Sequence, residues 1–315
     1  MYELASVDDE TSDLMLHDAK QAGFDTVRFW CFHKTPIEKL ESLVSSAKNY
    51  SIKLIPVLSD RWKYNQDFEI NSEWYINGYK EIYLPYVLKM LSHFKDSDEI
   101  LIWELINEPE TEKFELLYNF VQDVTQQIKK VNQKHFISIG TIGGIGDKFG
   151  SHFSRFNSQL FEKLYSIEEL DIISIHDYSY DSTIFDRTEI NYHFKGKGSL
   201  AKIFYTLNLP FTAIRKVLDE FFMKNFNKVI SNPVSVRWLW RHYIKKDIAI
   251  AKKLGKPIYI GEIGYKKHNG KLRKELIEFD KKRYFEMGVN GFLLWSFEAQ
   301  GKSKDGHGYG FEKLK

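Results

Sequence analysis

Two glutamates stand where two predicted strands end, and they are the residues of this sequence best suited to chemistry. Residues 100–106 form an almost wholly apolar run, which predicts a buried strand that stops at Asn107, Glu108 and Pro109. Pro109 cannot donate to a strand ladder and favours an extended backbone at Glu108. A second predicted strand ends at Glu262. The two carboxyl groups are far apart in sequence, so only the fold can bring them together.

Acetal hydrolysis is the chemistry that needs two such groups. One carboxylic acid must give its proton to the leaving oxygen, and one carboxylate must attack the anomeric carbon. A barrel of parallel strands could hold Glu108 and Glu262 about 5 Å apart, which is the geometry of retaining glycosidases. This argument predicts hydrolysis by double displacement.

Other polar residues are predicted to lie at the same strand ends. Arg28 could fix a carboxylate by a charge-assisted hydrogen bond, or it could form a structural salt bridge in the barrel. Asn107 suits a sugar hydroxyl. His176 and Tyr178 occupy alternate positions and should point the same way, although a lone histidine is often only structural.

Three tryptophans could offer a flat ring to a sugar. Trp295 ends the last predicted strand, where its indole could lie under the C–H face of a pyranose, or could simply pack in the core. Trp30 and Trp62 are further candidates for the same role, with core packing as the alternative.

The elements that must position these residues alternate between strand and helix. Such alternation indicates βα units around a parallel sheet. Strands are predicted at 26–31, 52–58, 100–106, 136–140, 171–176, 257–262 and 291–297. Helices are predicted at 8–22, 36–49, 74–94, 114–131, 158–166, 237–254 and 272–287. Thr35 is expected to cap the second helix, with Pro36 at its first position, and Pro85 to kink the third.

The predicted fold is an α/β (β/α)8 TIM barrel. Seven strands are visible where eight are needed, and helix 8–22 precedes the first of them, so the first barrel strand is expected to be missing or truncated. Residues 1–7 are too short and too irregular to replace it. Residues 1–315 are therefore expected to form one catalytic barrel domain.

A long segment interrupts the pattern after the sixth barrel strand, the strand that ends at His176. Residues 181–236 are far longer than an ordinary barrel loop and contain helical, lysine-rich patterns. A helical insertion is expected there. It could be a solvated decoration, a lid over the cleft or, less well supported, a membrane-contacting helix.

Composition excludes several classes of protein. The chain has 315 residues, 28% of them charged, and a net charge of +2, so nothing favours nucleic acid as a partner. A single cysteine, Cys31, excludes an internal disulfide and any multi-cysteine metal site. No apolar stretch is long enough to span a bilayer, and the first ten residues are not a signal peptide. An extracellular location is expected only if the N-terminus is truncated.

Familiar cofactor and nucleophile motifs do not fit. Residues 143–146 are glycine-rich after a strand, but Phe149 stands where the third glycine of a dinucleotide loop belongs. There is no H-E-x-x-H pair and no G-x-S-x-G elbow. We therefore expect no cofactor and no metal.

Five segments together resemble the clan A glycoside hydrolases, most closely family 5, the group of cellulases and β-mannanases. The segments that carry the resemblance are 26–30, 103–109, 176–178, 257–264 and 294–295. The resemblance implies that Glu108 is the acid/base and Glu262 the nucleophile. It also implies Arg28 and Tyr178 beside the nucleophile, Asn107 on the sugar 2-hydroxyl and Trp295 beneath the sugar.

The sequence departs from the family pattern at the missing first strand and at residues 58–62, where cellulase-like members often carry a histidine. The runs around Arg28 and Trp103 are closer to mannanase-like members. The expected function is a retaining endo-β-1,4-glycosidase acting on polysaccharide or oligosaccharide, with mannan favoured over cellulose. A carbohydrate-binding barrel with weak or no catalysis, and an exo-acting β-glycosidase, remain open as alternatives.

Overall fold

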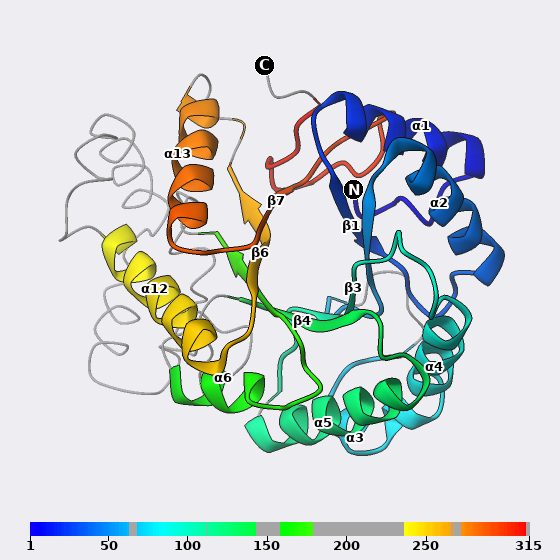
Figure 1. Cartoon of the computed structure of the whole chain (residues 1–315), viewed down its shortest axis with the longest axis vertical. Helices are drawn as coiled ribbons and strands as arrows, with labels where there is room; N and C mark the ends of the chain where they lie inside the picture. The colour runs from blue at the N-terminus through cyan, green and yellow to red at the C-terminus, as the bar shows by residue number, and fades with distance from the viewer. Residues whose placement is uncertain are drawn as a thin grey trace, which may run out of the picture.

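The computed structural model describes residues 1–62, 68–111, 113–142, 158–178, 236–265, 267 and 272–312. Seven parallel strands surround the centre of the molecule, and helices cover their outer side (Figure 1). The strands pair in sequence order, from β1 to β7. The fold is therefore a nearly closed (β/α)8-type barrel, as predicted. The expected insertion at 181–236 lies outside the described residues, apart from Val236 at the start of a helix.

The strands are β1 (Thr26–Trp30), β2 (Lys53–Val57), β3 (Ile102–Asn107), β4 (Phe136–Ile142), β5 (Ile173–Asp177), β6 (Ile258–Gly264) and β7 (Gly291–Trp295). The helices are α1 (Asp9–Gln21), α2 (Ile37–Tyr50), α3 (Ser72–Ile76), the 3-10 helix η1 (Gly78–Lys80), α4 (Tyr83–His93), α5 (Phe114–Val131), α6 (Ser158–Tyr165), α12 (Val236–Leu254) and α13 (Leu272–Glu286). All seven predicted strands are confirmed. Among the described helices, none is both long and apolar enough to cross a membrane.

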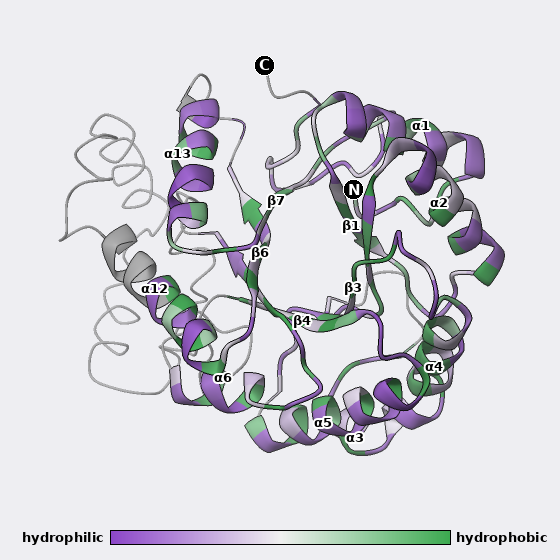
Figure 2. Ribbon diagram, in the orientation of Figure 1, coloured by the Kyte–Doolittle hydropathy of each residue, from purple (hydrophilic) through white to green (hydrophobic). Residues whose placement is uncertain are grey.

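The main core lies between the barrel wall and the helices. In α5, apolar side chains recur at helical spacing and are buried against the sheet: Leu117, Phe120, Val121, Val124 and Ile128. The helices turn such apolar residues inward and their polar residues to solvent (Figure 2). The strands β2 to β6 are buried almost throughout, because helices cover one side and the barrel interior fills the other.

Two predicted helices differ in detail from the structure. The second begins at Ile37 with Pro36 as its N-cap and no side-chain cap, so the predicted Thr35 cap is wrong. The predicted helix 74–94 is divided into α3, η1 and α4. Pro85 does not kink α4, because it lies in the first turn of this helix. Backbone N–H groups in a first turn have no intrahelical acceptor, so a proline there removes no helical hydrogen bond.

Pro56 is tolerated inside β2 because of where its missing N–H would point. The flanking Leu54 and Leu58 donate from their backbone nitrogens to Glu99 and Glu104, on the β3 side. Pro56 falls between them on that same side, and its ring removes one bond from this ladder only. Its pairing with Phe29 of β1 is kept.

No strand precedes α1 in the described structure, and residues 1–7 form turns instead. Tyr2 accepts a hydrogen bond from the Trp30 nitrogen at 3.1 Å, and the Met1 nitrogen donates to the Arg28 carbonyl at 3.5 Å. The seam between β1 and β7 is therefore closed by irregular backbone, and the prediction that no full strand precedes α1 is confirmed. A cavity of about 810 Å³ lies at the N-terminal ends of the strands beside this seam. Neither Glu108 nor Glu262 lines it.

Candidate active site

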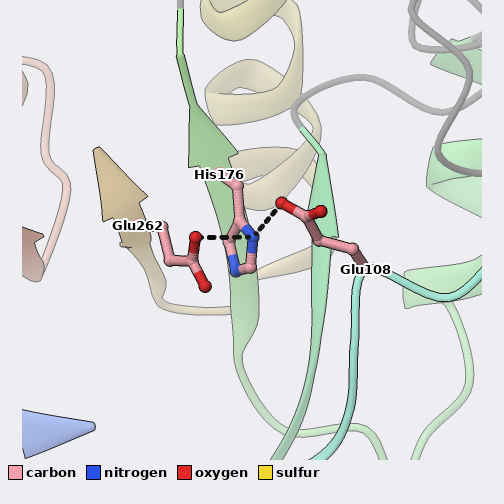
Figure 3. Close-up of side chains that lie close together, drawn as sticks. All are labelled: Glu108, His176 and Glu262. Carbon is pink, nitrogen blue, oxygen red and sulfur yellow. Dashed lines mark hydrogen bonds and ion pairs between the residues drawn. The ribbon is translucent and has the colours of Figure 1, made fainter. Parts of the chain in front are cut away.

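The carboxyl ends of β3, β5 and β6 bring three distant residues together. Glu108 directly follows β3, His176 lies near the end of β5, and Glu262 lies in β6 (Figure 3). The His176 ring stands between the two glutamates, with Nδ1 at 3.0 Å from Oε1 of Glu108 and 3.8 Å from Oε2 of Glu262. All three side chains are buried, His176 completely. The meeting of Glu108 and Glu262 is what the sequence predicted.

Irregularities in the ladder turn Glu262 into the barrel. In β6, Tyr259 faces the interior and Ile260 packs in the outer core. Strict alternation would then place Glu262 on the outer side. The pairing of β6 shifts by one residue at Gly261 relative to both β5 and β7, so Glu262 turns inward while Ile263 packs outside.

A register shift also redirects side chains in β3. Its register with β4 shifts between Glu104 and Asn107, so Leu105 and Ile106 both pack in the outer core. Asn107 consequently faces the interior beside Arg28. A β-bulge of this kind redirects a side chain and bends the strand locally.

Glu262 is held by two donors. Nη1 of Arg28 donates to its Oε1 at 2.7 Å, and the Tyr178 hydroxyl donates to its Oε2. Both are donations to a carboxylate, and the first is charge-assisted. This setting suits an ionised nucleophile, and it is the neighbourhood that the family resemblance implied.

Glu108 has a different environment. Its Oε2 accepts a hydrogen bond from the Trp62 indole nitrogen at 3.0 Å, and its Oε1 lies beside His176. Its backbone has a φ of 47°, so the predicted extended conformation at Glu108 is wrong. This left-handed backbone is unfavourable for a residue with a Cβ, and the bond from the Glu108 nitrogen to the Gly140 carbonyl at 2.8 Å helps to hold it.

The distance between the two carboxyl groups is short. One oxygen of Glu108, one of Glu262 and a ring nitrogen of His176 all lie within 4.8 Å of one another. Retaining glycosidases hold their carboxyl groups about 5–5.5 Å apart, whereas inverting ones need about 6.5–9.5 Å to admit a water molecule. The limit of 4.8 Å lies closer to the first range than to the second.

This group of atoms could also hold a divalent cation, which the sequence did not predict. A histidine nitrogen and two carboxylate oxygens are an acceptable donor set for such an ion. The Arg28 guanidinium, bound to Glu262, would oppose a second positive charge there.

Arg28 is the centre of a polar network beneath the site. Nη2 donates to Oδ1 of Asn107 at 2.8 Å, and the Asn107 amide nitrogen donates to Asp60 at 2.8 Å. Burial alone would lower the pKa of Arg28, but the adjacent Glu104 and Glu262 carboxylates raise it above its usual value. Asn107 is thus oriented on both sides of its amide.

The three tryptophans lie in different surroundings. Trp62 is 57% exposed beside Glu108. Trp295 is partly buried and stacks on Tyr2, with ring centroids 5.4 Å apart. Trp30 is only 7% exposed and packs behind Trp295 and against Phe32, so its burial does not support direct stacking on a sugar.

Sequence reasoning missed two members of the network. Glu104 is fully buried and contacts Arg28, and Asp60 is buried and orients Asn107. Glu104 was detectable, because it is a charged residue within an otherwise apolar strand, where an unpaired charge would be very costly. Asp60 gave no comparable signal, because it follows the strand in a polar stretch.

Comparison with known proteins agrees with this geometry. The family model described as cellulase (glycosyl hydrolase family 5) matches residues 2–299. A probable mannan endo-1,4-beta-mannosidase F from Neosartorya fischeri is 27% identical over 166 residues, which are 48% of this chain and 36% of that protein. The chain therefore spans well under half the length of this curated relative.

Solved structures share the fold at lower identity. An endo-1,4-beta-D-mannanase from Thermotoga petrophila matches with a TM-score of 0.66 and 20% identity, covering 98% of this chain and 90% of that one. An endoglucanase from Thermotoga maritima matches with a TM-score of 0.56 and 17% identity, covering 96% and 84%. Because the family model spans nearly the whole chain, and the buried glutamate pair has the spacing described above, the chain belongs to glycosyl hydrolase family 5.

Proposed function

We propose that the protein is a retaining glycoside hydrolase that cleaves β-1,4-linked hexose polysaccharides or oligosaccharides. The observation that carries this proposal is the approach of the Glu108 and Glu262 carboxyl oxygens to within 4.8 Å at the carboxyl end of the barrel. Family membership supports hydrolysis of glycosides as the class of reaction.

In the first step, a Glu262 carboxylate oxygen attacks the anomeric carbon and forms a covalent glycosyl ester. The bond to the leaving oxygen breaks, and that oxygen takes the proton of the Glu108 carboxylic acid. Arg28 and Tyr178 hold the attacking carboxylate in place. Both glutamates are buried, and the low local dielectric strengthens their electrostatic interactions with the reacting atoms.

In the second step, the Glu108 carboxylate takes a proton from a water molecule. The water oxygen attacks the anomeric carbon, and the ester bond to Glu262 breaks, which restores both glutamates to their starting states. Two inversions give net retention of configuration. His176, between the two side chains, fixes their relative position through both steps.

The proposed contacts of Asn107 and Trp295 with substrate follow from the family resemblance, and that of Trp62 from its exposure beside Glu108. Asn107 is proposed to donate to the sugar 2-hydroxyl, Trp295 to lie beneath the sugar ring, and Trp62 to contact a sugar beside Glu108. Mannan is favoured over cellulose because mannan endo-1,4-beta-mannosidases are among the relatives of this chain. The endoglucanase neighbours keep glucan as the second substrate to assay.

Substitutions of the two glutamates test both the activity of the protein and the role of each residue. Glu262→Gln is expected to abolish hydrolysis of mannan, cellulose and every aryl glycoside. Glu108→Gln should abolish hydrolysis of polysaccharide but still form the glycosyl ester from a 2,4-dinitrophenyl glycoside, whose leaving group needs no proton, so a burst of dinitrophenol should precede slow hydrolysis of that ester. Glu275→Gln, an exposed position on α13, serves as the matched control and should match the wild type.

Product stereochemistry and size complete the test. NMR of the first-formed sugar should show the β-anomer, and short oligosaccharides of several lengths would indicate endo action. Full activity in Glu262→Gln, or an inverted product, would overturn the proposal. Binding of mannan without hydrolysis would instead favour the carbohydrate-binding alternative.

A further inference from the structure

Glu104 is a buried carboxylate that the proposed reaction does not use. Its side chain is completely buried in the barrel interior. Both of its oxygens accept from Nε of Arg28 at 3.2 Å, and Oε1 also accepts from Nη2. Oε2 accepts from the Tyr259 hydroxyl at 2.8 Å and from the Ser174 hydroxyl at 3.3 Å.

Arg28 connects Glu104 to Glu262. The nitrogens that contact Glu104 are Nε and Nη2, while Nη1 remains for Glu262 at 2.7 Å. A guanidinium is planar and has five donors in fixed directions, so holding one edge fixes the other. One cation therefore lies between two carboxylates, and Glu104 sets its orientation.

The surroundings leave Glu104 little freedom. A Cβ added at Gly140 would lie 2.5 Å from Oε1 of Glu104, so only glycine allows this approach. Burial and the Glu104 charge next to it raise the pKa of Tyr259 well above its usual value, so its hydroxyl stays a donor. The carboxylate is thus fixed from several sides while it holds Arg28.

We propose that Glu104 is a positioning residue for the nucleophile: it fixes Arg28 and offsets its positive charge, so that Glu262 is oriented by Arg28 without being fully neutralised by it. The proposal rests on the proposed function, because it assigns Glu262 as the nucleophile. Without the negative charge at Glu104, a buried Arg28 has Glu262 as its main counter-ion, and Glu262 no longer experiences the repulsion of a second buried carboxylate, so Arg28 stabilises its charge more strongly.

This arrangement predicts a difference between the two chemical steps. A carboxylate bound more tightly by Arg28 attacks the anomeric carbon less readily, so formation of the glycosyl ester slows. The same stabilisation makes that carboxylate a better leaving group, so hydrolysis of the ester does not slow. General loosening of the barrel would slow both steps.

The experiment uses Glu104→Gln in the full chain, with Tyr259→Phe as the matched control. Tyr259→Phe removes one hydrogen bond to Glu104 but keeps its charge. Ester formation is followed as kcat/KM on a 4-nitrophenyl glycoside, and ester hydrolysis as kcat on a 2,4-dinitrophenyl glycoside under conditions where it limits turnover. The melting temperature of each variant is recorded beside the rates.

Glu104→Gln is expected to slow ester formation by about 10- to 100-fold, which corresponds to the roughly 1.5–3 kcal/mol that a hydrogen bond to a charged group is worth. Ester hydrolysis should keep its rate, and Tyr259→Phe should not separate the two steps. An equal fall in both steps, or no fall in either, would overturn the proposal.

A second measurement does not depend on activity. In a crystal structure of Glu104→Ala, Arg28 should still pair with Glu262, but its guanidinium should turn out of its present plane and change the geometry of the Nη1 contact. Retention of that contact in its present geometry would show that Glu104 does not position Arg28. If the wild type hydrolyses no glycoside, the proposed function fails, and this structure still decides whether Glu104 positions Arg28.

Discussion

The indole nitrogen of Trp62 lies 3.0 Å from Oε2 of Glu108, although more than half of the Trp62 side chain is exposed. The Arg61 guanidinium lies over the indole ring, 4.0 Å from its centroid, and pairs with Glu110. The loop after β2 is thereby joined to the loop after β3 at both Glu108 and Glu110. One side chain can therefore orient the carboxyl group of Glu108, the proposed acid/base, and still offer an aromatic surface to substrate.

Two substitutions at Trp62 separate these roles. Trp62→Phe keeps an aromatic ring but loses the N–H that stabilises the Glu108 carboxylate, so proton donation should weaken. A hydrogen bond to a charged group is worth about 1.5–3 kcal/mol, so kcat/KM on polysaccharide should fall roughly 10-fold or more. Trp62→Ala should in addition raise KM, because the sugar loses its aromatic contact.

Rates on substrates with different leaving groups show whether the indole N–H of Trp62 assists proton donation by Glu108. Trp62→Phe should leave hydrolysis of a 2,4-dinitrophenyl glycoside close to that of the wild type, since that reaction needs no proton from Glu108. Equal losses on both kinds of substrate would contradict an orienting role for the indole N–H.

Tyr2 joins the two edges of the barrel. Its carbonyl accepts from the Trp30 nitrogen, its ring stacks on Trp295 with an interplanar angle of 18°, and its hydroxyl donates to the Lys304 carbonyl at 2.7 Å. Tyr2→Ala should reduce the free energy of unfolding by about 2–3 kcal/mol, somewhat less than for a fully buried aromatic residue. It should also raise KM, because Trp295 loses the ring that supports it.

Tyr2→Phe isolates the hydroxyl. It keeps the stacking on Trp295 and should cost only about 1 kcal/mol, the usual value of one hydrogen bond. Urea denaturation provides the stability values, and steady-state kinetics provide KM. A Tyr2→Ala variant as stable as the wild type would show that the seam does not depend on this side chain.

The strands, and the positions of Glu108 and Glu262 at strand ends, could be predicted because the sequence signals for them are local. An apolar run that stops at Asn107 and Glu108 indicates both a strand and its polar end, and all seven strands were found in this way. The inward turn of Glu262 was not predictable from alternation, which places it on the outer side. Gly261 was the only local signal, and a glycine in a strand does not by itself reveal a bulge.

Contacts between loops could not be predicted from the sequence, for a different reason. The hydrogen bond from Trp62 to Glu108 depends on how two loops pack, and no periodicity records loop packing. The positive φ of Glu108 likewise opposes the local preference set by Pro109, and tertiary contacts prevail over that preference. The division of the predicted helix 74–94 follows no proline, since the break precedes Pro85.

His135 gives the fold a pH dependence that is independent of catalysis. Its Nδ1 faces two donors, the Asn132 amide at 2.8 Å and the Trp103 indole nitrogen at 3.3 Å. Its Nε2 lies 2.7 Å from the Ser97 carbonyl and must therefore carry the proton. Burial lowers the pKa of His135 below its usual value, so the neutral ring is favoured in the folded state.

Because the pKa of His135 is lower in the folded state, protonation at low pH reduces the stability of the fold. The folded protein binds the proton less tightly than the unfolded chain, so the contribution of His135 is fully present above the unfolded pKa of about 6.5 and is lost as the pH falls below it. Urea denaturation at pH 7.5 and 5.5 should show a smaller loss of stability for His135→Gln than for the wild type. His307→Gln, at an 82% exposed side chain, is the control and should lose as much stability as the wild type. An identical pH dependence in His135→Gln and the wild type would contradict the assignment, because the buried imidazole would then have no part in it.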